Sequence, residues 1–384
     1  MILADRLTNL MLAEDEYGQF GVGEYVTEPA TGAASSLPII FDGHNDVLSK
    51  LWREGGLPAA KSFLTGRAGA VDLPKAKAGG FGGGFFAIYI PSPMDRDART
   101  RQMSQPSYDL PLPDLIPVQD ALPVALAQAA ILARLEEFGC LKICRTAEEI
   151  RTCLDDGTIA AVMHIEGAEA IDEDLHALDV FYRAGLRSIG PVWSRPTIFA
   201  NGVPFRFPSD GDIGDGLTEH GIRLVRRCNE LGIMLDMSHL NEAGFWDVVR
   251  YSDAPIVATH SNVHRLSACS RNLTDRQLTA IADSGGMVGV NFSVPFLRAD
   301  GQKNAGTDID LVLAHLDHLI SVVGEDCVGL GSDYDGALVP EAITNVSDLP
   351  KLRTTMRSHG YDEPLMAKLC HDNWLRVLEK TWGA

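Results

Sequence analysis

Short apolar segments alternate along the chain with helical patterns of apolar and polar residues. The apolar segments are rich in β-branched and aromatic residues, and a polar or Gly-containing loop follows each one, as is typical of strands. The eight predicted strands span residues 38–44, 83–90, 159–166, 186–193, 233–239, 255–260, 287–293 and 327–333. Amphipathic helices are predicted at residues 118–138, 147–154, 172–184, 217–231, 242–251, 275–283, 309–323 and 364–380.

The repeated strand–helix order, with strands that are apolar on both faces, is typical of parallel sheets covered by helices. It predicts an α/β fold and a single (β/α)8 TIM-type barrel, with an open doubly wound sheet as the alternative. We expect residues 37–384 to form this barrel domain. Residues 1–36 end in a run of small residues and are expected to be an N-terminal lead-in, or an arm that packs on a partner subunit.

The composition is that of a folded, acidic globular protein, with 45% hydrophobic and 22% charged residues. The formal net charge of −19 disfavours nucleic acid and anionic lipid as partners. Seven cysteines without a CxxC pair indicate reduced thiols. Acidic residues interrupt the stretch where a signal peptide would be apolar, and no run approaches the roughly 18 apolar residues of a membrane span. We therefore expect a cytoplasmic protein without membrane association.

Histidines and carboxylates occur where five of the predicted strands end. The carboxyl ends of barrel strands surround the active site, so these side chains are expected to meet at one rim. His44 and Asp46 stand two residues apart and can therefore face the same side and bind one metal ion. The five strand ends carry His44 and Asp46, His164 and Glu166, Asp236 and His239, His260, and Asp333 and Asp335.

Taken singly, these residues have ordinary structural explanations. A lone histidine at a strand end is usually a hydrogen-bonded polar residue, and an aspartate beside glycine usually belongs to a turn. Five coincidences at one predicted position instead indicate a site. Without clustered cysteines, this donor set suits zinc or a similar divalent ion, and it exceeds what one ion needs. Glu166 is the natural carboxylate to hold two ions about 3.5–4 Å apart, with a hydroxide trapped for attack on a carbonyl.

The order and spacing of these motifs resemble the membrane dipeptidase (renal dipeptidase) family of zinc peptidases, within the amidohydrolase superfamily. The resemblance runs from about residue 38 to 380 and includes the flanking segments 80–85 and 270–272. It implies that one zinc ion binds His44 and Asp46, that the other binds His239 and His260, and that Glu166 and a water or hydroxide bridge both ions. It also suggests a homodimer.

The same resemblance implies roles for two residues outside the ligand set. Arg271 would receive the free C-terminal carboxylate of a dipeptide, for which a guanidinium fork is suited, although a structural arginine in a loop is the alternative. Asp333 would be the acid–base residue, which takes a proton from the bridging water and passes it to the leaving amine. Asp335 is expected to be structural.

The chain departs from the family pattern at the end of the fourth strand. There the family has a histidine that contacts the substrate carbonyl, and this chain has Trp193. An indole N–H donates one hydrogen bond but carries no charge, and loss of an oxyanion donor costs about 2.7–4 kcal/mol. The second zinc ion, Arg195, His164 or His220 could compensate. Asn291, at the end of the seventh strand, is a further candidate for substrate contact.

These observations predict a binuclear zinc-dependent dipeptidase for dipeptides with a free C-terminal carboxylate, D-residues at that position included. The alternative is a binuclear metal amidohydrolase for a different small amide or ester, because Trp193 replaces the substrate-binding histidine. A barrel that only binds or supports a partner is the third reading, and the intact ligand set argues against it. The long loop at 195–215 is expected either to cover the active site or to pack on a neighbouring subunit.

Overall fold

Each predicted strand coincides with a strand of the computed structural model, which describes residues 37–92 and 96–383. The predicted arm at residues 1–36 lies outside this described part of the chain. The strands at the predicted positions are β1 (Ile40–Asn45), β2 (Phe81–Tyr89), β5 (Ile159–Glu166), β6 (Leu186–Gly190), β8 (Met234–Leu235), β9 (Val257–Ala258), β10 (Met287–Asn291) and β11 (Val328–Gly331).

These strands pair in parallel and in the order of the sequence. One sheet runs β1-β2-β5-β6-β8, with the short β4 (Leu141–Ile143) also paired to β5, and a second sheet runs β9-β10-β11. Isolated parallel bridges join Asp236 to Val257 and Asn45 to Tyr334, next to the edges of the two sheets. Tyr89 pairs with Glu166, and Asn291 pairs with Gly331, so the carboxyl ends of neighbouring strands lie level.

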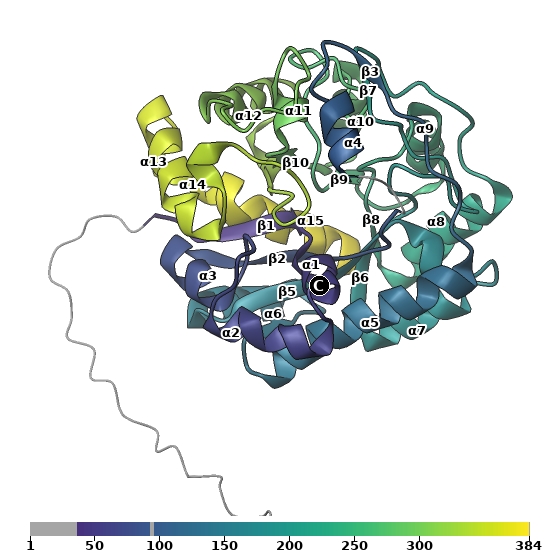
Figure 1. Ribbon diagram of the computed structural model, residues 1–384, viewed down its shortest axis with the longest axis horizontal. Coiled ribbons are helices and arrows are strands. Elements are labelled where there is room, and N and C mark those ends of the chain that lie inside the picture. The colour runs from purple at the N-terminus through teal and green to yellow at the C-terminus, as the bar shows by residue number, and fades with distance from the viewer. Residues whose placement is uncertain (1–36, 93–95, 384) are drawn as a thin grey trace, which may run out of the picture. The chain divides into compact units, whose positions relative to one another are not determined.

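The predicted helices are present and lie around the strands (Figure 1). Five of these helices have side-chain N-caps, in which a side-chain oxygen accepts a hydrogen bond from a backbone N–H of the first turn. The capping residues are Thr146, Thr218, Asn241, Thr274 and Asp362. The helices at the predicted positions are α5 (Val118–Glu137), α6 (Ala147–Asp156), α7 (His176–Ala184), α8 (Glu219–Leu231), α9 (Glu242–Tyr251), α10 (Asp275–Asp283), α12 (Asp310–Val323), α14 (Glu363–Ala367) and α15 (Asn373–Trp382). A π-helix at Lys368–Asp372 joins α14 to α15.

Several short elements were not predicted from the sequence. Most lie in the connections, where few residues are available to show a period. The helices are α1 (Val47–Arg53), α2 (Ser62–Thr65), α3 (Leu73–Gly79), α4 (Arg96–Gln102), α11 (Val294–Leu297) and α13 (Leu349–His359), with 3-10 turns at Leu57–Lys61, Ala168–Ala170, Glu325–Cys327, Glu341–Ile343 and Val346–Asp348. Two strands of two residues each form an antiparallel pair: β3 (Tyr108–Asp109), between α4 and α5, and β7 (Arg206–Phe207), in the long loop that follows β6.

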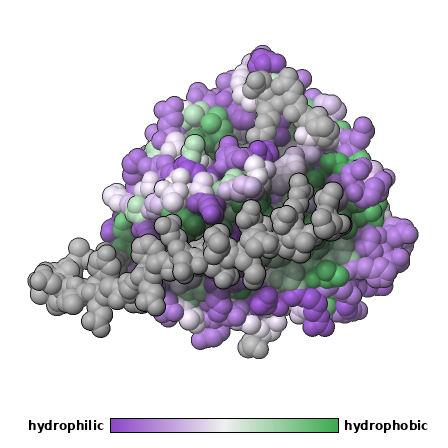
Figure 2. Space-filling model, turned by 60° about the horizontal axis from the view of Figure 1, so that its bottom comes forward, coloured by the Kyte–Doolittle hydropathy of each residue, from purple (hydrophilic) through white to green (hydrophobic). Residues whose placement is uncertain are grey.

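Helix α5 corrects one expectation from the sequence. It has 20 residues with a mean hydropathy of 1.2, which by length and composition is enough to cross a membrane. One such helix is weak evidence, because a helix that covers the core of a globular fold passes the same test. Here Gln128 of α5 hydrogen-bonds both the N–H and the C=O of Tyr89 on β2. Figure 2 shows a mainly hydrophilic face of the molecule with smaller hydrophobic patches.

Trp374 of α15 fills the space between the strands and positions β1. Its ring packs 5.2 Å from the ring of Phe85, and its Nε1–H donates to the carbonyl of Leu330 at 3.1 Å. A Cβ atom on Gly43 would lie 2.5 Å from the Trp374 ring and 2.4 Å from the carbonyl oxygen of Thr259. Only glycine therefore allows this approach, which holds His44, the next residue, beside the ends of the other strands.

Candidate active site

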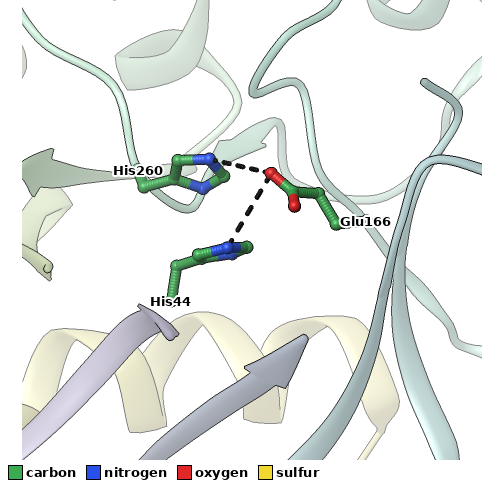
Figure 3. A group of neighbouring side chains, drawn as sticks. All are labelled: His44, Glu166 and His260. Carbon is green, nitrogen blue, oxygen red and sulfur yellow. Dashed lines mark ion pairs between the residues drawn. The ribbon is translucent and has the colours of Figure 1, made fainter. Parts of the chain in front are cut away.

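The five predicted metal ligands converge where the strands end. Oε1 of Glu166 lies 3.0 Å from Nε2 of His239, 3.4 Å from Nε2 of His260 and 3.8 Å from Nε2 of His44. Nε2 of His44 also lies 3.4 Å from Oδ2 of Asp46. Figure 3 shows the imidazoles of His44 and His260 directed at the Glu166 carboxylate. The structure thus brings all five residues together. His44 and Glu166 lie at the ends of β1 and β5, and the other three, Asp46, His239 and His260, lie shortly after the ends of β1, β8 and β9.

The donor atoms form two overlapping groups that fit metal ions. Those of His44, Glu166 and His260 lie within 4.8 Å of one another, and so do those of His44, Asp46 and Asp333. Both ring nitrogens of His44 are buried and have no hydrogen-bond partner in residues 37–92 and 96–383. Nitrogen and carboxylate donors without thiolate are typical of zinc and similar divalent ions in hydrolases.

The electrostatics of the cluster also favour a bound cation. Burial lowers the pKa values of His239 and His260 well below the usual range, so both imidazoles are neutral and keep a lone pair for a metal. Burial raises the pKa of Glu166 well above its usual range. Burial opposes a charge on His44 too, but the carboxylates of Glu166 and Asp46 outweigh it and raise the pKa of His44 to about 10. A positive charge among these carboxylates is therefore favourable, and a bound cation would supply it in place of the proton on His44.

Hydroxyl groups behind the histidines fix the orientation of their rings. Nδ1 of His239 lies 2.8 Å from Oγ of Ser194, and Nδ1 of His260 lies 2.8 Å from Oγ1 of Thr259. The Thr259 hydroxyl donates to Oδ2 of Asp236 at 2.6 Å, so it accepts from His260. Nε2 of each imidazole is left to face the cluster. Asp236 was predicted at the rim, but it lies beneath the cluster and holds His260 through Thr259.

Two site residues have strained backbones. His239 and Asp333 have φ angles of 71° and 60°, in the left-handed region that residues other than glycine rarely adopt. The amide of Asp333 donates to the carbonyl of His44 at 3.0 Å, and the carbonyl of His239 accepts from the amide of Val203 at 2.8 Å. Such strain persists only where the surroundings enforce it, and it concentrates at functional sites.

Asp333 lies beside the metal-ligand cluster and is held by Asn291. Nδ2 of Asn291 donates to Oδ2 of Asp333 at 3.0 Å, and burial raises the pKa of Asp333 to about 6. Asn291 is fully buried, so the structure gives it a contact with Asp333, and its contact with substrate stays a prediction. Asp335 is paired with Arg67 at 2.9 Å and accepts from the amide of Ala70, as a structural residue would.

Arg271 is buried behind the cluster. Nη1 donates to Oγ of Ser261 at 3.0 Å, and Nη2 donates to the carbonyl of His260 at 3.1 Å. Its Nε has no hydrogen-bond partner in the part of the chain that the structure describes. Arg271 does not appear among the residues that line the cleft over the metal cluster, so its role as carboxylate receptor stays a prediction.

A cleft of about 420 Å³ opens over the cluster, with Asp46, Glu166, His239 and Asp333 in its lining. Trp193 forms part of the wall, and its ring centre lies 5.6 Å from that of His239. Phe205, from the predicted covering loop, also lines the cleft and packs 5.6 Å from Trp193. This contact favours the interpretation that the loop shapes the site.

None of the three side chains considered as substitutes for the missing histidine lines the cleft. The guanidinium of Arg195 is buried against Glu169. His164 lies beneath the cluster with Nδ1 2.9 Å from Oγ of Ser188, and His220 is a neighbour of Arg223 on α8. Tyr89, at the end of β2, does line the cleft, 5.2 Å from Trp193 between ring centres.

A parallel α/β fold whose strand ends carry histidines and carboxylates into one cleft defines the metal-dependent hydrolases. Comparison with protein families agrees with this class. The model of the membrane dipeptidase family, peptidase family M19, matches residues 34–382, and the chain therefore belongs to this family of metallopeptidases.

Relatives are similar over most of the chain. A crystal structure of a metallopeptidase from Rhodobacter sphaeroides, liganded with a phosphinate mimic of the dipeptide L-Ala-D-Ala, is 56% identical, with a TM-score of 0.88 over 90% of this chain and 100% of that one. A second structure, described as a dipeptidase of family M19, is 56% identical with the same TM-score over 91% and 99%. An uncharacterised protein from the pqqA 5′ region of Klebsiella pneumoniae is 46% identical over 68% of this chain and 98% of its own length.

Proposed function

We propose that the protein is a binuclear zinc dipeptidase that cleaves dipeptides with a free C-terminal carboxylate and accepts a D-residue at that position. One observation carries the proposal: the Glu166 carboxylate lies within 3.8 Å of three imidazole Nε2 atoms on the floor of a cleft. The phosphinate mimic of L-Ala-D-Ala bound by the relative from Rhodobacter sphaeroides supports the substrate class.

The ligand set divides between two ions. His44 and Asp46 would hold one ion, His239 and His260 would hold the other, and Glu166 would bridge both. When bound, zinc lowers the pKa of water and polarises the substrate carbonyl as a Lewis acid. The hydroxyls of Ser194 and Thr259 support this division, because they keep Nε2 of His239 and His260 directed at the cluster.

The chain's own residues would move the proton. Asp333 takes a proton from the attacking water on its carboxylate and delivers it to the nitrogen of the leaving amine, so one group serves as base and then as acid. Its pKa of about 6, raised by burial, is close to neutrality and suits both steps. Asn291 holds Oδ2 of Asp333, which leaves Oδ1 for the transfer. Arg271 would stabilise the substrate carboxylate from behind the wall.

The proposal also covers the closure of the barrel, the cellular compartment and the oligomeric state. The bridges from Asp236 to Val257 and from Asn45 to Tyr334 support a closed (β/α)8 barrel, because they link the edges of the two sheets. All seven cysteines are buried and free, which supports a reducing compartment such as the cytoplasm. A homodimer follows from the family resemblance alone, and analytical ultracentrifugation of the full chain tests it.

The deciding experiment is hydrolysis of a dipeptide panel by zinc-loaded protein, with L- or D-residues at the C-terminal position. We expect two zinc ions per chain by metal analysis, cleavage that a chelator abolishes, and recovery when zinc is restored. If none of the dipeptides is hydrolysed while two metal ions are still bound, the dipeptidase assignment is wrong. It would favour the hydrolase of a different small amide or ester, with Trp193 shaping the cleft for that substrate.

A further inference from the structure

The part of the cleft wall away from the metal ligands is basic, although the chain as a whole is acidic. Four cationic side chains line the cleft, and the formal net charge of the chain is −19. The lining also contains four carboxylates, those of Asp46, Glu166, Asp333 and Asp335, so its formal charge is balanced whereas that of the chain is strongly negative. The four cationic residues are Lys50, Arg53, Arg99 and Lys303.

Two of these cations lie on α1, directly after the metal ligand Asp46. Lys50 lies one helical turn after Asp46, and its amide donates to the carbonyl of Asp46 at 3.0 Å. Lys50 and Arg53 are half-buried, and neither has a carboxylate within ion-pair distance in the described ranges 37–92 and 96–383. Arg53 makes its hydrogen bonds to the backbone carbonyl and hydroxyl of Ser49, which leave its charge uncompensated.

The other two cations, Arg99 and Lys303, lie near the aromatic wall of the cleft. The guanidinium of Arg99 lies 4.2 Å from the centre of the Phe205 ring and 5.6 Å from that of Trp193. Lys303 donates to Oγ1 of Thr100 at 3.3 Å, next to Arg99 on α4. Positive charge therefore faces the cleft beside the ends of both β1 and β6.

Among the described residues, the carboxylates of the lining do not neutralise Lys50 and Arg53. Asp46, Glu166 and Asp333 belong to the metal cluster, and Asp335 is paired with Arg67. With two divalent ions and a bridging hydroxide bound, the charges of the three cluster carboxylates would be balanced. A dipeptide with uncharged side chains has one carboxylate, at its C-terminus. The positive charges of Lys50 and Arg53 in this cleft can bind a second carboxylate.

We propose that the cleft selects dipeptides with an acidic side chain, aspartate or glutamate, and that Lys50 is the residue that meets this second carboxylate. The inference rests on the proposed dipeptidase function. Arg53 adds positive charge beside Lys50 and helps to draw the anion into the cleft, since positive charge in a cleft concentrates a substrate of the opposite sign.

Matched substrate pairs test the proposal with the zinc-loaded enzyme. The pairs are L-Ala-D-Glu with L-Ala-D-Gln, and L-Glu-D-Ala with L-Gln-D-Ala, which differ only in a charged or neutral isosteric side chain. In one of the pairs we expect kcat/KM about 10-fold higher for the acidic member, which corresponds to one partly exposed ion pair plus the field. A ratio of one or less in both pairs overturns the inference.

Two variants and a control assign the effect to the basic wall. Lys50→Met keeps the length of the side chain and should lower the acidic-to-neutral ratio at least about 3-fold, and Arg53→Met should lower it in the same direction. Lys61→Met removes an exposed lysine that does not line the cleft and should leave the ratio unchanged. A ratio that is the same in Lys50→Met as in the wild type contradicts the role of Lys50.

Salt supplies a measurement that needs no variant. Raising the ionic strength from about 0.05 M to about 0.5 M should reduce the preference for the acidic member, because screening shortens the range of the field. A salt-independent ratio contradicts the inference. Cleavage of the neutral members separates this failure from that of the proposed function: if all four dipeptides resist the zinc-loaded enzyme, the dipeptidase assignment itself is wrong.

Discussion

Replacing Thr259 with valine tests whether the hydroxyl behind His260 prepares the metal site. Thr259 is fully buried. Its Oγ1 donates to Oδ2 of Asp236 at 2.6 Å and accepts from Nδ1 of His260 at 2.8 Å. Valine has nearly the same shape but no hydroxyl, so Thr259→Val removes both hydrogen bonds without opening a cavity. The ring of His260 then loses the contact that sets its tautomer and rotation.

The cost can be divided between metal affinity and stability. Asp236 keeps two other donors, the amides of Ser238 at 3.0 Å and of Thr259 at 2.8 Å, so it should stay in place. The loss then falls mainly on His260. Removing a partner of a metal-bound histidine typically weakens metal binding about 10- to 100-fold, or about 1.4–2.7 kcal/mol. The unpaired Nδ1–H of His260 should also destabilise the metal-free fold by about 1–3 kcal/mol.

Zinc competition with a chromophoric chelator measures the first quantity, and urea unfolding of the metal-free protein measures the second. Thr259→Ser is the matched control, because serine keeps the hydroxyl and should bind zinc within a few-fold of the wild type. Zinc affinity in Thr259→Val equal to that of the wild type would refute the reasoning. So would a Thr259→Ser variant as weak as the valine variant, because the hydroxyl would then not be the cause.

Three further substitutions probe other parts of the site. Asp333→Asn should keep the zinc content and lower kcat by about 10²–10⁴, because an amide cannot carry the proton, whereas near-normal turnover removes Asp333 from the mechanism. Arg271→Met should raise KM chiefly for substrates with a free carboxylate, and an equal effect on C-terminally amidated substrates would exclude its predicted role. Arg195→Met should destabilise the fold by about 3–5 kcal/mol at neutral pH in urea unfolding, because it leaves Glu169 charged and buried. Burial already raises the pKa of Glu169, so a proton can replace the lost partner, and this destabilisation should grow as the pH rises; a loss below about 1 kcal/mol contradicts the reasoning.

The strands could be predicted because burial on both faces leaves a local mark in the sequence. All residues of β2 and β5 are buried, and His164 and Glu166 at the end of β5 are the only strongly polar residues in these two strands. The prediction was less accurate at strand ends. β8 and β9 each contain two residues, although the apolar pattern continues beyond them. Apolar character reports burial, and it does not report which backbone groups pair with a neighbouring strand.

The short helices after β1 show the opposite limit. α1 has seven residues and follows Asp46, a proposed metal ligand, and two glycines come one residue after its end. Too few residues are present for a helical period to be recognised. These residues nevertheless place Lys50 and Arg53 in the cleft wall. The basic wall was therefore invisible in a sequence whose overall charge is strongly negative.

The sequence by itself determined which residues stand at the carboxyl ends of the strands, because strand periodicity and the position of each histidine or carboxylate are local properties. Only the tertiary structure decided what each of them contacts. It placed Asp236 beneath the ligands, joined Asn291 to Asp333, and paired Arg67 with Asp335 across 268 positions of the chain. Such contacts depend on how all the strands and their connections pack together, and no local pattern encodes that packing.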